Sequence, residues 1–325
     1  MAAMVARGFA ALLFTASLLP AAATAQGFPN KPIRLVVPQA PGSATDLLGR
    51  SVAAEIETIL NQKIIVENKP GAAFTIGLDL VAKAAADGYT LGMGPVGALA
   101  ISPNMIAKVP YDILRDFQPV AQLTRGHLLL AVAPNSNIHS VKELIAEAKK
   151  YPGKLTNASS ASGSPGHVGG ELFKVMTGTN IVHVPYRGGA AAMNDLIAGH
   201  VQIMFESLNS IAPHAHSGKV RGLAVSGGRR SPMFPNLPTV AEAGVPGYDL
   251  TPWYGLLFPA GTPRAIVAQL NREIGGILTT PEMAERFRNQ GIDLVTSTPE
   301  AFGALIKLEI PRWRKVVKDS GATAG

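Results

Sequence analysis

The sequence of 325 residues contains no cysteine, only 6% aromatic residues and no apolar stretch long enough to span a membrane. Without cysteine the chain can form neither disulfide bonds nor a thiolate metal site, and it has no thiol nucleophile. The apolar stretch GFAALLFTASLL near the N-terminus has 12 residues, whereas a membrane-spanning helix needs about 20. These absences favour a chain that relies on an ordinary hydrophobic core, without covalent or metal cross-links.

The same apolar stretch lies between Arg7 and the sequence Ala23, Thr24, Ala25. A short positive segment, an apolar segment and an A-x-A site are typical of a secretory signal peptide. We therefore expect residues 1–25 to be removed and the mature chain to begin at Gln26 as a soluble, exported protein.

The sequence also lacks a concentrated block of charge. It contains 29 Lys and Arg residues and 22 Asp and Glu residues, which gives a net charge of +7. The basic residues are scattered, and their densest cluster is the pair Arg229 and Arg230. A nucleic-acid groove needs a continuous basic stripe with interleaved aromatic residues, which this sequence lacks. The chain is not expected to bind nucleic acid, although its positive charge favours small anions.

Familiar catalytic and metal-binding motifs are missing as well. A serine hydrolase needs G-x-S-x-G, but in SGSPG the glycine Gly163 directly precedes Ser164. His214 and His216 form an H-x-H pair without a third ligand or an adjacent carboxylate, so a metal site is not expected. We predict no catalytic centre, no metal and no cofactor, with a hydrolase as the less favoured alternative.

What the chain does have is an alternation of strand-like and helix-like segments. PIRLVV, KIIVEN, YTLGMG, HLLLAVAP, IVHVPY and VQIMFES are typical of buried strands, and segments with helical spacing of apolar residues separate them. Strands that alternate with helices predict parallel sheets in an α/β fold. The length allows two domains, and the absence of a long Gly/Ser linker predicts that the chain crosses between them on strands.

Three strand-to-helix loops share a composition rich in small residues, glycine and proline: PQAPGSATD (38–46), ASGSPGH (161–167) and VPYRGGAAA (184–192). In open parallel sheets, ligands bind beyond the carboxyl ends of the strands, where such loops enter helices. The first turn of a helix leaves backbone N–H groups unpaired and carries partial positive charge, which suits a carboxylate. Together the loops predict a cradle for a small anion, with Thr45 or Asp46 as the cap of the first helix.

Individual loop residues have both a binding and a structural interpretation. Asp46 could bind a ligand amine or water, or it could cap its helix. Ser162 and Ser164 could donate hydroxyl hydrogen bonds to a carboxylate, or serve the turn and the cap. His167, in the first turn of its helix, could pair with an anion, or it could lie at the surface or serve as a cap.

Three residues outside these turns have similar alternatives. Tyr186 could donate to the ligand or pack at the end of a strand. Glu206 ends the strand VQIMFE, where it could bind a ligand amine or water, or be solvated. Phe74 could be a wall of the pocket or part of the core.

The motifs FPNKPIRLVVPQAPGSATD, VENKPGAAFTIG, ADGYTLGMG, VPYRGGAAAMNDLIAGHVQIMF and WYGLLFPAGTP follow one another along the mature chain. In these motifs the chain resembles the Bug-type extracytoplasmic solute receptors, the substrate-binding components of tripartite tricarboxylate transporters. The resemblance implies a two-lobed periplasmic-binding-protein-like fold of type II with a central ligand cleft. We expect the first lobe at residues 26–124 plus 253–325 and the second lobe at residues 125–252.

The resemblance further implies a periplasmic receptor for a small carboxylate: a di- or tricarboxylate, an acidic amino acid, or an aromatic or heterocyclic acid. Ser43 stands where the family usually has a second glycine, and Phe74 replaces a small residue, so both are expected at the pocket wall. The expected partners are the permease subunits of such a transporter or, alternatively, a membrane sensor, with the receptor itself a monomer. The candidate ligand-binding residues are Gln39, Gly42, Ser43, Ala44, Thr45, Asp46, Phe74, Ser162, Gly163, Ser164, His167, Tyr186, Gly188, Gly189, Ala190 and Glu206.

Overall fold

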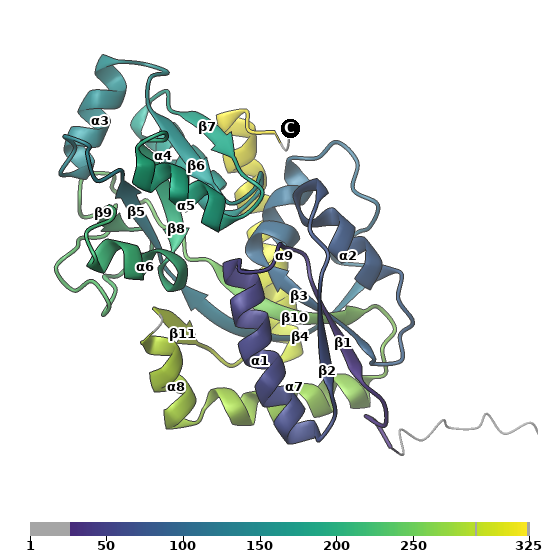
Figure 1. The fold of residues 1–325 in the computed structure, drawn as a ribbon. Helices are drawn as coiled ribbons and strands as arrows, with labels where there is room; N and C mark the ends of the chain where they lie inside the picture. The colour runs from purple at the N-terminus through teal and green to yellow at the C-terminus, as the bar shows by residue number, and fades with distance from the viewer. Residues whose placement is uncertain (1–26, 290, 324–325) are drawn as a thin grey trace, which may run out of the picture.

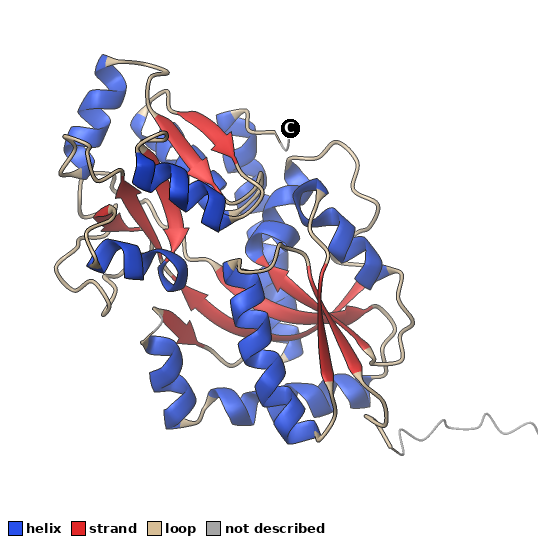
Figure 2. Cartoon of the chain, in the orientation of Figure 1, coloured by secondary structure: helices blue, strands red, loops and turns tan. Residues whose placement is uncertain are grey.

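The computed structural model describes residues 27–289 and 291–323, so the predicted signal peptide at residues 1–25 lies outside the described part. The described chain forms two β-sheets, and helices cover both of them (Figure 1). Helices and strands alternate along much of the chain (Figure 2), which confirms the predicted α/β fold.

The first sheet contains six strands in the order β11-β4-β10-β3-β1-β2. β1 is parallel to β2 and β3, whereas β10 is antiparallel to β3 and β4, and β11 is antiparallel to β4. The strands are β1 (Ile33–Val37), β2 (Ile64–Asn68), β3 (Thr90–Pro95), β4 (Phe117–Gly126), β10 (Trp253–Pro259) and β11 (Ile292–Leu294).

The second sheet contains five strands in the order β7-β6-β8-β5-β9. β6 is parallel to β7 and β8, whereas β5 is antiparallel to β8 and β9. The strands are β5 (Leu128–Val132), β6 (Thr156–Ser159), β7 (Val182–Pro185), β8 (Ile203–Ser207) and β9 (Arg221–Val225).

Both sheets therefore share a topology in which three parallel strands are followed by one antiparallel strand, which is β10 in the first sheet and β5 in the second. The prediction of parallel strands alone is wrong for β5 and β10. These two strands follow the points where the chain passes from one sheet to the other. A parallel neighbour in the same sheet needs a crossover helix, whereas a strand that arrives from elsewhere can pair in the antiparallel sense.

Nine α-helices and three short turns of 3₁₀ or π helix connect the strands in the described part of the chain. The helices are α1 (Ala44–Leu60), α2 (Thr75–Ala82), α3 (Val141–Lys150), α4 (Pro165–Thr177), α5 (Gly189–Ala198), α6 (Leu208–His216), α7 (Arg264–Leu278), α8 (Pro281–Arg288) and α9 (Pro299–Ser320). The short turns are η1 (Ala72–Phe74), η2 (Gly97–Ile101) and η3 (Ser102–Asn104).

Apolar side chains at helical spacing attach α1 and α7 to the first sheet. Leu48 and Ile56 of α1 and Leu270 of α7 belong to one buried cluster with Leu35 of β1. Burial of one such side chain stabilises the fold by about 1.5–3 kcal/mol. This packing fixes the first turn of α1 beside the end of β1, where the loop of residues 38–43 begins.

Helix α9 connects the two halves of the molecule, because it packs both on β4 of the first sheet and on α4 beside the second. Sequence patterning does not predict α9, since Pro311 lies inside it and a proline usually ends or kinks a helix. The helix extends past the proline because Thr298 caps its start and Gly321 its end, while Phe302 and Trp313 are buried.

Candidate functional site

Two adjoining cavities lie where loops of the first sheet face loops of the second. The wide cavity has a volume of about 740 Å³, within the range of about 300–1,000 Å³ typical of small-molecule sites. The small cavity has about 20 Å³, close to the space of one water molecule. Both are lined by Gln39, Ser43 and Ser160.

Each cavity takes residues from both halves of the chain. The small cavity is lined by Gln39, Gly42, Ser43, Ala44, Leu128, Ser160, Pro165, Gly166, Gly189, Glu206, Ser207, Ser210 and Tyr254. The wide cavity is lined by Pro38, Gln39, Ala40, Ser43, Pro70, Gly71, Ala72, Ala73, Phe74, Ser160, Ala161, Ser162, Pro185, Tyr186, Arg187 and Gly188.

The loop between β1 and α1 brings Ser43 to both cavities. Ser43 caps α1, because its Oγ accepts a hydrogen bond from the Asp46 N–H at 3.2 Å, while its own N–H donates to Ala40 O. The cap is therefore Ser43 and not Thr45 or Asp46: its extended backbone (φ −71°, ψ 160°) brings the hydroxyl to the third helical residue. Gly42 supplies the left-handed turn before it, with φ 77°.

Asp46 fixes this loop and does not line the cavities. Its carboxylate accepts hydrogen bonds from the Gly42 N–H and from Asn68 Nδ2, each at 2.9 Å, and forms an ion pair with Arg50 at 3.0 Å. Burial raises the pKa of Asp46, but these bonds outweigh burial, and the net pKa is below its ordinary value. Thr45 is buried as well and likewise lines neither cavity.

The loop between β6 and α4 repeats this geometry in the second sheet. Ser164 caps α4, because its Oγ accepts from the His167 N–H at 3.3 Å, and Gly163 has φ 76°. His167 Nδ1 accepts from the Gly163 N–H at 3.0 Å, as the Asp46 carboxylate does in the first loop. Ser164 and His167 are buried behind the loop and line neither cavity, whereas Ser162 lines the wide one.

The ring of His167 stacks on that of His183 from β7, with centroids 3.6 Å apart and planes 11° from parallel. Burial, with the charge of Lys174 as a smaller cause, lowers the pKa of His167 to about 3 and that of His183 to about 4. Both rings are therefore neutral at pH 7. His167 does not provide the positive charge for an anion that its place in the sequence allowed.

The loop between β7 and α5 has no side-chain cap; its N-cap is Gly188. Gly188 lines the wide cavity and Gly189 the small one, while Ala190 is exposed and lines neither. Tyr186 lines the wide cavity, but its hydroxyl donates to Asp195 Oδ2 at 2.5 Å. Burial and this carboxylate raise the pKa of Tyr186 to about 12, so it presents mainly its ring to the cavity.

Phe74 ends a run of residues in the left-handed region: Ala72, Ala73 and Phe74 have φ of 44°, 48° and 76°. Non-glycine residues in this region each cost on the order of 1 kcal/mol, so surrounding contacts must hold the run in place. A Cβ on Gly97 would lie 3.1 Å from Phe74 Cε2, and one on Gly163 would lie 3.7 Å from the same atom. The ring therefore packs between the two halves, where it is both core and wall of the wide cavity.

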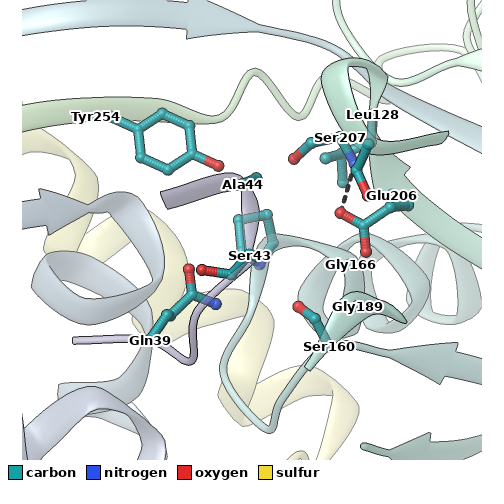
Figure 3. A pocket seen from close by; sticks show the side chains of 13 residues that line it. Gln39, Ser43, Ala44, Leu128, Ser160, Gly166, Gly189, Glu206, Ser207 and Tyr254 are labelled. Carbon is teal, nitrogen blue, oxygen red and sulfur yellow. Dashed lines mark hydrogen bonds between the residues drawn. The ribbon is translucent and has the colours of Figure 1, made fainter. Parts of the chain in front are cut away.

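Glu206 is the last residue but one of β8 and faces the small cavity opposite Ser43 (Figure 3). Its Oε1 accepts a hydrogen bond from the Ser207 N–H at 2.9 Å, and the residue is only 7% exposed. Burial raises the pKa of Glu206 to about 7, against the lowering effect of the Ser207 N–H. The alternative of a solvated strand end is wrong, because Leu128 and Tyr254 line the same enclosed space.

The predicted site residues therefore divide into two groups. Those that line a cavity are Gln39, Gly42, Ser43, Ala44, Phe74, Ser162, Tyr186, Gly188, Gly189 and Glu206. Those that line neither are Thr45, Asp46, Gly163, Ser164, His167 and Ala190.

Sequence reasoning missed Ser160, Ser207, Tyr254 and Arg187, which line the cavities. Arg187 lies inside the third loop motif, directly before two glycines, so its positive charge could have indicated a residue of an anion site. Tyr254 carried no signal, because it enters the site on a strand far along the chain from the loops that it faces.

Within residues 27–289 and 291–323, no three His, Asp or Glu side chains are grouped as a metal site would require. His216 of the H-x-H pair stacks on Phe234. Over the same described residues, no helix has the length and apolar character needed to cross a membrane.

Known proteins match the chain along most of its length. Residues 48–322 match the tripartite tricarboxylate transporter family receptor. The chain is 37% identical over 305 residues to protein BugT of Bordetella pertussis, covering 94% of each chain.

Solved structures give the same answer. The R. palustris protein Rpa4515 with adipate superimposes with a TM-score of 0.87 and 36% identity, over 91% of this chain and 99% of that one. MatC from Rhodopseudomonas palustris with bound malate gives 0.84 and 31% identity, over 89% of this chain and 100% of that one. These similarities confirm the predicted periplasmic-binding-protein-like fold. The chain belongs to the tripartite tricarboxylate transporter receptor family.

Proposed function

We propose that this protein is a solute receptor that captures a small carboxylate in its cleft and presents it to the permease of a tripartite tricarboxylate transporter. Its lobes are residues 26–124 plus 253–325 and residues 125–252, each centred on one sheet. The observation that carries the proposal is the wide cavity, because the loops that enter α1, α4 and α5 all line it. Three helix starts around one cleft stabilise a bound anion.

The first turn of α1 has hydrogen-bond donors to offer a carboxylate. The described bonds use the N–H groups of Gly42, Ser43 and Asp46, whereas the first helical N–H groups, those of Ala44 and Thr45, have no partner within the helix. The Ser43 hydroxyl accepts from Asp46 and still has its own proton to donate. These groups suit one carboxylate at the border of the two cavities.

The ligands of two structural neighbours support the ligand class. Rpa4515 was solved with adipate and MatC with bound malate, and both ligands are small carboxylates. We infer the same class for this chain, with the remainder of the ligand in the cleft that the two adjoining cavities form.

The proposal assigns the receptor to the periplasm and gives it no catalytic role. Serine hydroxyls line both cavities, but no histidine does, so the lining lacks the serine–histidine pair of a serine hydrolase. A receptor of this kind binds and releases its ligand unchanged.

A thermal-shift screen tests the proposal against di- and tricarboxylates, acidic amino acids and aromatic acids. A ligand at 100 times its Kd stabilises the folded state by about 2.7 kcal/mol, which raises the Tm visibly. Calorimetric titration then gives the Kd, and analysis of the recovered ligand tests for turnover. The proposal fails if no carboxylate raises the Tm, or if the bound carboxylate is converted.

Co-purification from membranes tests the partner. The receptor, loaded with the carboxylate found in the screen, should retain the permease subunits of a tripartite transporter. Retention of a membrane sensor in their place would overturn the transport assignment while leaving carboxylate binding intact.

A further inference from the structure

The buried carboxyl group of Glu206 lines a cleft that we propose binds anions, where its negative charge would repel a second carboxylate. Glu206 is 7% exposed, and one of its oxygens accepts the Ser207 N–H at 2.9 Å. Its other oxygen, Oε2, has no hydrogen bond among the described residues and would lie 3.4 Å from a Cβ on Gly189. An acidic oxygen thus faces the small cavity with its hydrogen-bonding capacity unused (Figure 3).

The surroundings of this carboxyl explain how it can be buried. The small cavity is lined by residues from the first turns of four helices: Ala44 of α1, Gly166 of α4, Gly189 of α5, and Ser210 of α6, whose N-cap is Ser207. Helix N-termini carry partial positive charge, and here they converge from both sheets. Glu206 supplies a negative charge at the place where these dipoles meet.

Among the ionisable side chains considered on the elements around the small cavity, none places a positive charge beside the Glu206 carboxylate. Asp46 of α1 is engaged by Arg50, and His167 of α4 is neutral. Tyr254 of β10 shares the cavity, and burial raises its pKa to about 12, so it is also neutral. Arg187 lines only the wide cavity.

Building on the proposed function, we infer that Glu206 selects ligands by their second polar group. The favoured ligand has a carboxylate at one end and a hydrogen-bond donor, an ammonium or a hydroxyl, at the end that reaches Glu206. A second carboxylate at that end meets a like charge in a desolvated space and is rejected. Glu206 thereby acts as a specificity-determining residue of the receptor.

Protonation of Glu206 relaxes this selection. Burial raises its pKa to about 7, so the group is mostly ionised at pH 8 and mostly protonated at pH 6. A protonated Glu206 donates a hydrogen bond to a second carboxylate. Binding of a dicarboxylate should therefore tighten as the pH falls through 7, with uptake of a proton, while binding of an ammonium ligand should weaken.

Four six-carbon probes test the inference by calorimetric titration at pH 8: adipate, 6-aminohexanoate, 6-hydroxyhexanoate and hexanoate. Wild type should bind the amino and hydroxy acids more tightly than adipate. Glu206→Gln removes the charge and keeps the shape, so it should tighten adipate binding and weaken 6-aminohexanoate binding, each by about tenfold or more. Glu242→Gln, at an exposed ion pair in the same half of the chain, is the control and should change neither.

The amino and hydroxy probes separate the two possible donors. A loss for 6-aminohexanoate alone in Glu206→Gln assigns an ammonium, and a loss for both assigns a neutral hydrogen bond as well. The pH profile of wild type between 8 and 6 is a second readout that needs no variant.

The inference is overturned if Glu206→Gln leaves the ratio of adipate to 6-aminohexanoate affinity within about twofold of wild type. An adipate affinity in wild type that is flat from pH 8 to pH 6 overturns it equally. Its failure differs from failure of the proposed function: in the first case carboxylates bind without this selectivity, and in the second no carboxylate of the screen binds wild type.

Discussion

The loops after β1 and β6 have the same backbone conformation, but the side chain that holds each loop differs in its charge. In each, a left-handed glycine precedes a serine cap, and the third helical side chain accepts the N–H of that glycine. In the first loop the accepting side chain is Asp46, whose charge is balanced by Arg50. In the second it is His167, a neutral ring stacked on another histidine.

The two serine caps also differ in what surrounds them. Ser43 lines both cavities, whereas Ser164 is fully buried and lines neither. One backbone motif thus occurs twice, and side-chain packing decides which of its serine caps faces the cavities. Residues Ser160 and Ser162, just before the second cap, take the place that Ser43 has in the first loop.

Acid should affect the two loops in different pH ranges, and this is the largest effect we expect. His167 and His183 titrate near 6.5 when unfolded but at about 3 and about 4 when folded. The unfolded state therefore binds more protons, and the free energy of unfolding should fall by about 6 kcal/mol from pH 7 to pH 4, because both pKa values are lowered on folding. Asp46 acts below this window, because its lowered pKa contributes stability that is lost only as carboxylates protonate near pH 4 and lower.

Urea unfolding at a series of pH values measures this difference. His167→Asn keeps an acceptor for the Gly163 N–H and should reduce the slope between pH 6.5 and pH 4, with His183 left to contribute the rest, whereas Asp46→Asn should leave that slope unchanged. Equal slopes in wild type and His167→Asn would contradict the assignment of acid sensitivity to the second loop.

The two loops also differ in the room for a side chain at the second residue of the helix that follows each of them. At this position α1 has Thr45 and α4 has Gly166, where a Cβ would lie 2.2 Å from the Phe205 carbonyl oxygen. Gly166→Ala should therefore lower the free energy of unfolding by about 3 kcal/mol. Gly189→Ala is the matched control, since its Cβ would meet its nearest atom at 3.4 Å. Similar unfolding midpoints in urea for both variants would show that α4 can shift to accept the methyl group.

How much of this could be predicted depends on whether the signal is local. Gly, Ser and Pro mark the three loops in the sequence, and the strands before them have apolar runs, so the loop positions are correct. Helix α9 was not predicted. Pro311 is typical of a helix end, and the sequence around it does not reveal that the helix packs against β4 and α4. The boundaries of the lobes stay a prediction.

The site shows the same division between local and distant information. Ser43, Gly188 and Gly189 were found because loop composition places them after strands. The burial of Glu206 was not found, because Leu128 and Tyr254, which enclose it, come from strands distant in sequence. His167 accepts a loop N–H, in keeping with the capping alternative, but its burial was not found, since its partner His183 lies on another strand.

A carboxylate at the first cap should affect ligand binding more than folding. Asp is as good a helix cap as Ser, so Ser43→Asp should fold normally. It sets a like charge against the bound carboxylate, however, and should weaken binding by about 100-fold. Calorimetric titration with the carboxylate found in the screen measures this, and Ser140→Asp, at the cap of α3 away from both cavities, is the control. Equal affinities in Ser43→Asp and wild type would remove this loop from the binding site.

The smallest effect concerns the Ser43 hydroxyl itself. A glycine at the position of Ser43 could adopt a left-handed backbone, but Ser43 has φ −71°, and Gly42 takes the left-handed conformation. Ser43→Ala therefore causes no change in backbone strain and removes only the hydroxyl. The loss of the cap should cost about 1 kcal/mol of stability, and the loss of a direct bond to the ligand about 0.5–1.5 kcal/mol of binding free energy. Ser164→Ala should lose the same stability in urea but no affinity, because Ser164 lines neither cavity. If both variants lose affinity equally, the two loops act through the closure of the lobes, and the hydroxyl of Ser43 has no special place at the ligand.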